Sequence, residues 1–143
     1  NEAGITLQLE APEHSVWVEG DPILIDELLG NLIDNALRYA TGAHYIRLVV
    51  TSTPPTLAVE DDGPGISTQE QGRVFEAFYR SPDAPQGGSG LGLAIVREIA
   101  RAHGAWWNLV SRPQFAGARL TVVFPGTRRG AQLTRLDRFN QLR

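Results

Sequence analysis

The sequence predicts an α+β fold in which helices pack on one face of a mixed β-sheet. Short strand-like segments lie before, between and after two longer segments with helical periodicity, and the first two strand-like segments alternate apolar and polar residues as half-buried strands do. The order strands, helix, strands, loop, helix, strands is typical of an α+β domain. The length of 143 residues, with 42% hydrophobic and 20% charged residues, indicates one globular domain with a buried core.

The first elements have clear boundaries. Residues 5–10 and 15–19 alternate as strands do. Asp21 is a candidate N-cap and Pro22 suits the first turn of a helix that we expect to run to about Tyr39. The apolar face of this helix consists of Ile25, Leu28, Leu29, Leu32, Ile33 and Ala36.

The later elements follow in the order strand, strand, short helix, long helix, strand, strand. We expect them at residues 45–50, 55–60, 73–79, 91–103, 106–110 and 118–124. The turn Asp61-Asp62-Gly63-Pro64-Gly65 follows the second of these strands, a polar loop at 81–90 precedes the long helix, and Gly104 ends that helix.

Composition excludes several classes of protein. No run of eighteen apolar residues and no charged-then-apolar leader is present, so we expect a soluble, cytoplasmic piece without membrane insertion. The absence of cysteine excludes disulfides and thiolate metal sites. A net charge of −3 argues against nucleic acid as a partner. The chain starts at Asn1 and has no methionine, so we expect it to be part of a longer protein.

One face of the first helix carries a polar stripe. Glu27, Asn31, Asn35 and Arg38 are spaced four, four and three residues apart and share that face. Asparagine is a mediocre helix former, and its amide offers an oxygen to a hard cation and N–H groups to a phosphate. A nucleotide-bound Mg²⁺ takes only one or two ligands from the protein. A merely solvated polar face is the alternative.

Two glycine-rich turns follow the stripe in the chain. In VEDDGPGI a strand ends in adjacent carboxylates, and an aspartate there would accept from an exocyclic amine and select adenine over guanine. In GGSGLGL, residues 87–93, glycines precede a helix N-terminus, where free N–H groups favour phosphate. The spacing is not that of a Rossmann motif, and the chain has no lysine for a P-loop. Taken singly, each segment also fits an ordinary turn or connector.

Four motifs in order resemble the catalytic ATP-binding domain of bacterial two-component sensor histidine kinases, over roughly residues 5–125. NLIDNALRYA is similar to the N box of that family, VEDDGPGI to its G1 box, RVFEAFYR to its F box and GGSGLGLAIV to its G2 box. The resemblance implies a two-layer sandwich of a mixed sheet with helices on one face, as in gyrase, chaperone and mismatch-repair ATPases. The ATP site would lie between helices and a mobile lid, which we expect to be ordered by nucleotide over residues 81–88.

The resemblance also implies a site for ATP and Mg²⁺. Asn35 would ligate the metal with Asn31 beside it, Arg38 would lie near the phosphates and Tyr39 near the adenine. Asp61 would bind the adenine amino group. Phe75 and Phe78 would anchor the covering segment, although both equally suit plain core packing, and Arg80 would contact a phosphate or a partner. The remaining nucleotide-binding residues would be Gly63, Gly65, Ile66, Gly88, Ser89, Gly90, Leu91, Gly92 and Leu93.

The resemblance favours phosphate transfer over hydrolysis. ATPases of this superfamily place a glutamate base four residues before the metal asparagine, and this chain has Asn31 there, with Glu27 one turn further back. His14, His44 and His103 lack the helical pattern of a phosphoacceptor, so we expect no catalytic residue here. The implied partners are the protein's own dimerisation and phosphoacceptor domain and a response regulator, with a membrane sensor as the parent protein. A serine kinase of the anti-sigma-factor type and a domain that only senses nucleotide remain alternatives.

The C-terminal end changes composition. We divide the chain into an ATP-binding domain, residues 1–125, and a basic tail, residues 126–143, with five arginines and one acidic residue. We expect this tail to fray. A weak amphipathic helix that docks on an acidic partner or a membrane surface is the alternative.

Overall fold

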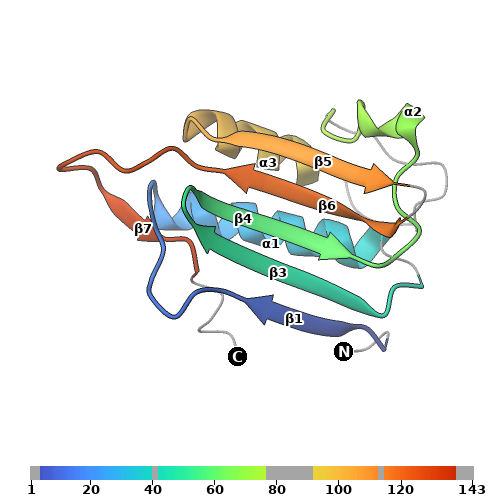
Figure 1. Ribbon diagram of the computed structural model, residues 1–143. Helices are drawn as coiled ribbons and strands as arrows, with labels where there is room; N and C mark the ends of the chain where they lie inside the picture. The colour runs from blue at the N-terminus through green and yellow to red at the C-terminus, as the bar shows by residue number, and fades with distance from the viewer. Residues whose placement is uncertain (1–3, 40–41, 77–91, 113–114, 138–143) are drawn as a thin grey trace.

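A five-stranded mixed sheet forms the body of the molecule (Figure 1). The computed structural model describes residues 4–39, 42–76, 92–112 and 115–137. The strand order is β1-β3-β4-β6-β5, with β1 parallel to β3 and the other neighbours antiparallel. The strands are β1 (Thr6–Glu10), β3 (Tyr45–Ser52), β4 (Pro55–Asp61), β5 (Trp106–Arg112) and β6 (Phe115–Val123). The prediction of a mixed sheet is confirmed.

Two long helices, α1 (Pro22–Tyr39) and α3 (Gly92–Ala102), cover one face of this sheet (Figure 1). Asp21 caps α1, because its Oδ1 accepts the backbone N–H of Ile23 at 2.7 Å. Gly104, with φ of +64°, follows the end of α3. The predicted apolar face of α1 is buried against the sheet, and Leu28 and Leu32 are fully inaccessible. Each such leucine contributes about 2 kcal/mol of burial free energy, so the core holds helices and sheet together.

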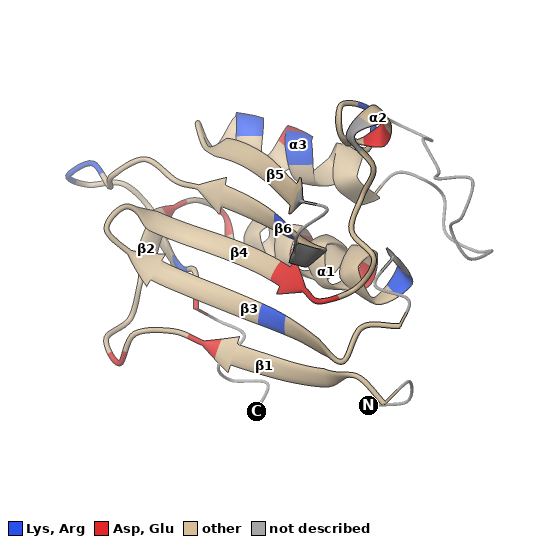
Figure 2. Ribbon diagram, turned by 45° about the vertical axis from the view of Figure 1, so that its right-hand side comes forward, with Lys and Arg blue, Asp and Glu red and all other residues tan. Residues whose placement is uncertain are grey.

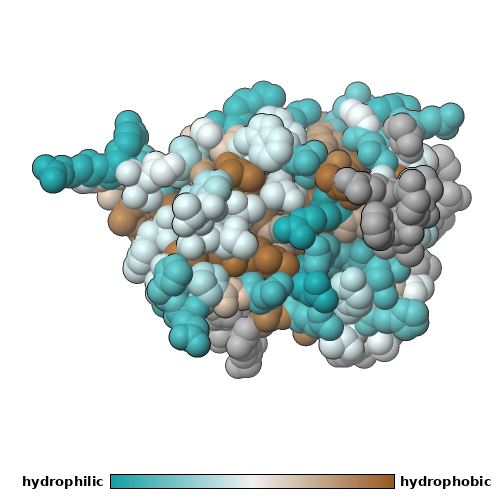
Figure 3. Space-filling view, in the orientation of Figure 1, coloured by the Kyte–Doolittle hydropathy of each residue, from teal (hydrophilic) through white to brown (hydrophobic). Residues whose placement is uncertain are grey.

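The opposite face of the sheet is covered by no helix of the described chain, and charged residues lie along its strands (Figure 2). Arg47 on β3 donates to Glu60 Oε1 on β4 at 2.8 Å, and Arg119 on β6 donates to Glu60 Oε2 at the same distance. Hydrophilic and apolar residues are interspersed on this side of the molecule (Figure 3). Both ion pairs are partly exposed to solvent and stabilise the fold only modestly, so this face is held mainly by the hydrogen-bonded strand ladder.

The short helix predicted at 73–79 is wrong for its described part, since residues 73–76 form turns. The helix lies earlier, as α2 (Thr68–Gln71). Ser67 precedes it with an extended backbone, and its hydroxyl donates to Glu70 Oε2 at 3.1 Å. A serine followed three residues later by glutamate is a known start signal. Here the two side chains bond to each other, and the Ser67 side chain makes no capping bond to a backbone N–H group. Phe75 packs against the core and Trp107, with ring centroids 6.5 Å apart.

The frayed tail is also wrong for residues 133–137. Strand β7 (Leu133–Arg135) pairs antiparallel with β2 (Trp17–Glu19) in a separate two-stranded sheet. Leu136 is 1% exposed within the core, and its N–H donates to Val16 C=O at 2.8 Å. The carboxylate of the buried Asp137 accepts from Val16 N–H and from Arg135. The backbone groups of β2 bind those of β7, which lies more than 100 residues further along the chain. These hydrogen bonds and the burial of Leu136 outweigh the loss of chain entropy in the tail. The described helices include none that is long and apolar enough to cross a membrane.

Candidate functional site

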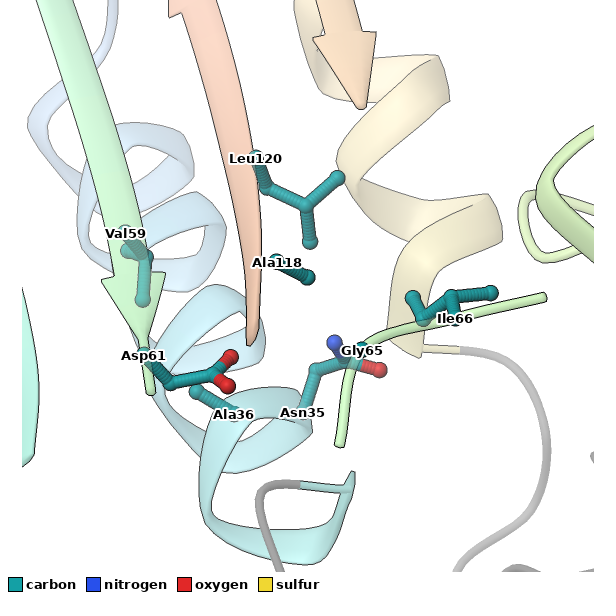
Figure 4. Close-up of a pocket in the computed structure, with 8 residues that line it drawn as sticks. All are labelled: Asn35, Ala36, Val59, Asp61, Gly65, Ile66, Ala118 and Leu120. Carbon is teal, nitrogen blue, oxygen red and sulfur yellow. The ribbon is translucent and has the colours of Figure 1, made fainter. Parts of the chain in front are cut away.

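A pocket opens where α1, the end of β4, the following loop and β6 meet (Figure 4). The space between its lining atoms, open solvent included, amounts to about 360 Å³. Its walls come from four separate segments of the chain, and they are lined by Asn35, Ala36, Val59, Asp61, Gly65, Ile66, Ala118 and Leu120. The N-box and G1-box segments, 26 residues apart at Asn35 and Asp61, are therefore brought to one site. Apolar walls with a few polar groups are typical of a small-molecule site.

Asp61 is the acidic group of this pocket. Its half-buried carboxylate points toward the Asn35 amide in Figure 4. Burial raises the pKa of Asp61 above its ordinary value, although backbone N–H groups of Gly63 and Ala118 act to lower it. The Gly63 N–H donates to Asp61 Oδ1 at 2.8 Å. The carboxylate is therefore oriented by the backbone and keeps acceptor capacity toward the pocket.

Asp62, the adjacent carboxylate, has a different role. It turns away to the start of β3, where its Oδ1 accepts the N–H groups of His44 and Tyr45 at 2.7 and 3.0 Å. Partial desolvation acts to raise the pKa of Asp62, but these two backbone bonds and the His44 side chain lower it overall. The two neighbouring aspartates thus have opposite pKa shifts, and only Asp61 belongs to the pocket.

The polar stripe of α1 is only partly assembled into the pocket. Asn35 lines it, whereas Asn31 lies beside the start of α3: its Nδ2 donates to Glu27 C=O at 2.9 Å and its Oδ1 faces Gly92. Arg38 pairs with Asp34 one turn back, with Nε and Oδ2 2.9 Å apart. The glutamate side chain of residue 27 is exposed.

Of the predicted nucleotide-binding glycines, the structure describes some and not others. Gly65 has φ of +81°, and a Cβ there would lie 2.6 Å from Ser111 Oγ, so this turn requires glycine. Gly92 opens α3, and Leu93 is 7% exposed in the core beneath it. The side chain of Tyr39 and all of Phe78, Arg80, Gly88, Ser89, Gly90 and Leu91 lie outside the described residues, as does the predicted lid at 81–88.

Sequence reasoning missed a wall of the pocket. Ala118 and Leu120 on β6 line it, and Gly117 before them has φ of +111°. A Cβ on Gly117 would lie 1.9 Å from Asp61 C=O, so β6 approaches β4 closely only because this residue is glycine. The available signal is a glycine directly before the predicted strand at 118–124, inside the observed strand β6.

A mixed sheet is covered on one face by two helices, and a helix asparagine and a strand-end aspartate face one pocket; this is the arrangement expected of the two-layer sandwich that the four motifs imply. The family model of the histidine kinase-, DNA gyrase B- and HSP90-like ATPases matches residues 20–128, and the chain belongs to this family. Its relatives are sensor kinases, which identifies it as the ATP-binding catalytic domain of a histidine kinase.

Several relatives support this assignment. The sensor protein QseC of Escherichia coli is 40% identical over 72% of the chain and 22% of its own length. The sensor protein BasS of Salmonella typhimurium is 40% identical over 82% of the chain and 33% of its own length. The solved mycobacterial sensor histidine kinase MprB matches with a TM-score of 0.74 and 32% identity, covering 87% of this chain and 85% of that one. The chain thus spans about a fifth to a third of the length of these curated relatives.

Proposed function

We propose that this chain binds Mg–ATP in the pocket between Asn35 and Asp61 and supplies the γ-phosphate to a histidine of a separate dimerisation domain. From that histidine the phosphate would pass to an aspartate of a response regulator. The observation that carries the proposal is the placement of an amide and a carboxylate, from two family motifs, around one apolar-walled pocket (Figure 4). A solved full-length relative, ShkA, which is 25% identical, was crystallised with the ATP analogue AMPPNP.

The residues present fit both parts of the ligand. Asp61 accepts hydrogen bonds, as an exocyclic amine requires, and the carbonyl of guanine at that position would meet a like partial charge. Val59, Ile66 and Leu120 offer apolar surface to a flat base. Asn35 offers one neutral oxygen, which suits a cation that is otherwise held by phosphates and water.

The chain's polar groups favour transfer over hydrolysis. General-base activation of water requires a group that takes a proton, and an amide does not do so. Asn31 is the residue at the superfamily position of that base, and its Nδ2 is held by the helix carbonyl of Glu27. ATP bound here would therefore keep its γ-phosphate until an acceptor side chain arrives. The alternatives, a serine kinase and a nucleotide sensor, predict a different acceptor or none.

Calorimetric titration with ATP, with and without Mg²⁺, tests the binding step. We expect Asn35→Ala to lose the magnesium-dependent part of the affinity, because one metal ligand is removed. Asn108→Ala is the matched control, since Asn108 lies on β5 and does not line the pocket. Unchanged magnesium dependence in Asn35→Ala would refute the metal assignment.

Radiolabelled ATP and a dimerisation domain added in trans test the transfer step. Label on a histidine of the added domain supports the kinase. Label on a serine supports the serine kinase, and binding without any transfer supports the sensor.

A further inference from the structure

Ser111 joins two walls of the pocket without lining it. It is the last residue of β5 before the β-bulge with β6. Its Oγ accepts the backbone N–H of Ile66 at 2.8 Å and donates to the C=O of Gly117 at 3.0 Å. Ile66 belongs to the loop wall of the pocket, and Gly117 immediately precedes the β6 wall. One hydroxyl therefore bridges the loop and the strand.

Gln71 holds the same peptide from the other side. Its Nε2 donates to Ile66 C=O at 2.8 Å and to Ser111 C=O at 3.3 Å. Both backbone polar groups of Ile66 are thus bound by side chains, from α2 and from β5. The glycine at 65 lets this loop lie directly against Ser111. The position of the Ile66 side chain, opposite Asp61 in Figure 4, depends on these bonds.

We propose that Ser111 and Gln71 are positioning residues of the nucleotide site, which set the distance between the Ile66 wall and the Asp61–Ala118 side of the pocket. The inference rests on the proposed function. Its physical reason is the steep distance dependence of dispersion: a gap of about 0.5–1 Å beside a bound ring forfeits a quarter to a half of the contact energy. Without Ser111 and Gln71, the backbone N–H and C=O of Ile66 would lose the side-chain partners that fix the position of this loop.

The main test compares Ser111→Ala with Thr134→Val. Thr134 is a matched control, because its buried hydroxyl donates to Gly20 C=O at 2.7 Å in a part of the fold that does not line the pocket. Each variant loses one hydroxyl, so we expect similar losses of thermal stability. ATP should bind Ser111→Ala about fivefold more weakly, which corresponds to about 1 kcal/mol. Thr134→Val should bind ATP as the unmodified chain does.

Gln71→Ala and enzyme kinetics separate positioning from general stability. In phosphotransfer to the added domain, Ser111→Ala and Gln71→Ala should raise the KM for ATP and leave kcat unchanged. The reason is that the Ile66 wall contacts the nucleotide equally in the ground state and in the transition state. Unchanged affinity in Ser111→Ala, or an equal loss in Thr134→Val, would overturn the inference while the proposed function stands.

Amide hydrogen exchange on the ligand-free chain gives a readout that needs no nucleotide. The Ile66 N–H should exchange faster in Ser111→Ala and at the original rate in Thr134→Val. Failure of the unmodified chain to bind ATP would refute the proposed function. Unchanged Ile66 exchange in Ser111→Ala would instead refute the hold of Ser111 on the loop.

Discussion

Gly117→Ala tests the close approach of β6 to β4 that forms one wall of the pocket. The new Cβ would lie 1.9 Å from Asp61 C=O, and ordinary contact begins at 3.4 Å, so the strands would have to separate by about 1.5 Å. That separation would break the end of the β4–β6 ladder, whose last pair is Glu60 with Arg119. A φ of +111° adds backbone strain of about 1–3 kcal/mol for alanine.

Gly130→Ala is the control that separates the cost of backbone strain at positive φ from the cost of the Cβ clash. Gly130 also has positive φ, +80°, but a Cβ there meets no atom within 4 Å. We expect Gly130→Ala to lower the free energy of unfolding by about 1–2 kcal/mol. Gly117→Ala should lower it by more than about 3 kcal/mol and also weaken ATP binding, because strain and overpacking add.

Urea denaturation of both variants measures the difference, with the m-value showing whether each still unfolds in two states. Nucleotide titration of the folded variants measures the pocket. The reasoning is refuted where Gly117→Ala costs no more stability than Gly130→Ala.

Two further predictions concern Asp61 and the C-terminal strand. Because the pKa of Asp61 is raised, ATP affinity should fall with decreasing pH already above the ordinary carboxyl pKa of 3.8. Asp61→Asn should bind ATP more weakly than the unmodified chain by about 1.5–3 kcal/mol and should lack this pH dependence. Equal pH profiles of ATP affinity in the variant and the unmodified chain would contradict the assignment. Leu136→Ala should lower the unfolding free energy by about 2–5 kcal/mol in urea, because its side chain is 1% exposed, whereas the exposed Leu133→Ala should change it little. A small effect at Leu136 would mean that the tail frays after all.

Much of the fold and half of the site were predictable because their signals are local. Helical periodicity with the Asp21 cap predicts α1, and two strand-like segments around a short turn predict the β3–β4 pair. The same periodicity places Asn35 on the polar side of α1, and the strand-end position of Asp61 places it beside the turn glycines. These features depend on residues within a few positions of each other. The start of α2 has a local signal too, the pair Ser67 and Glu70, which lies upstream of the predicted helix at residues 73–79.

The sequence by itself determined the two long helices, the β3–β4 pair and the identity of the two polar residues at the pocket. Only the tertiary structure decided which distant segments complete it. Ser111 bonds Ile66 across 45 positions, Gly117 approaches Asp61 across 56, and β7 joins β2 across more than 100. No local pattern encodes such contacts, because they depend on which free strand edge or backbone group the rest of the folded chain leaves within reach.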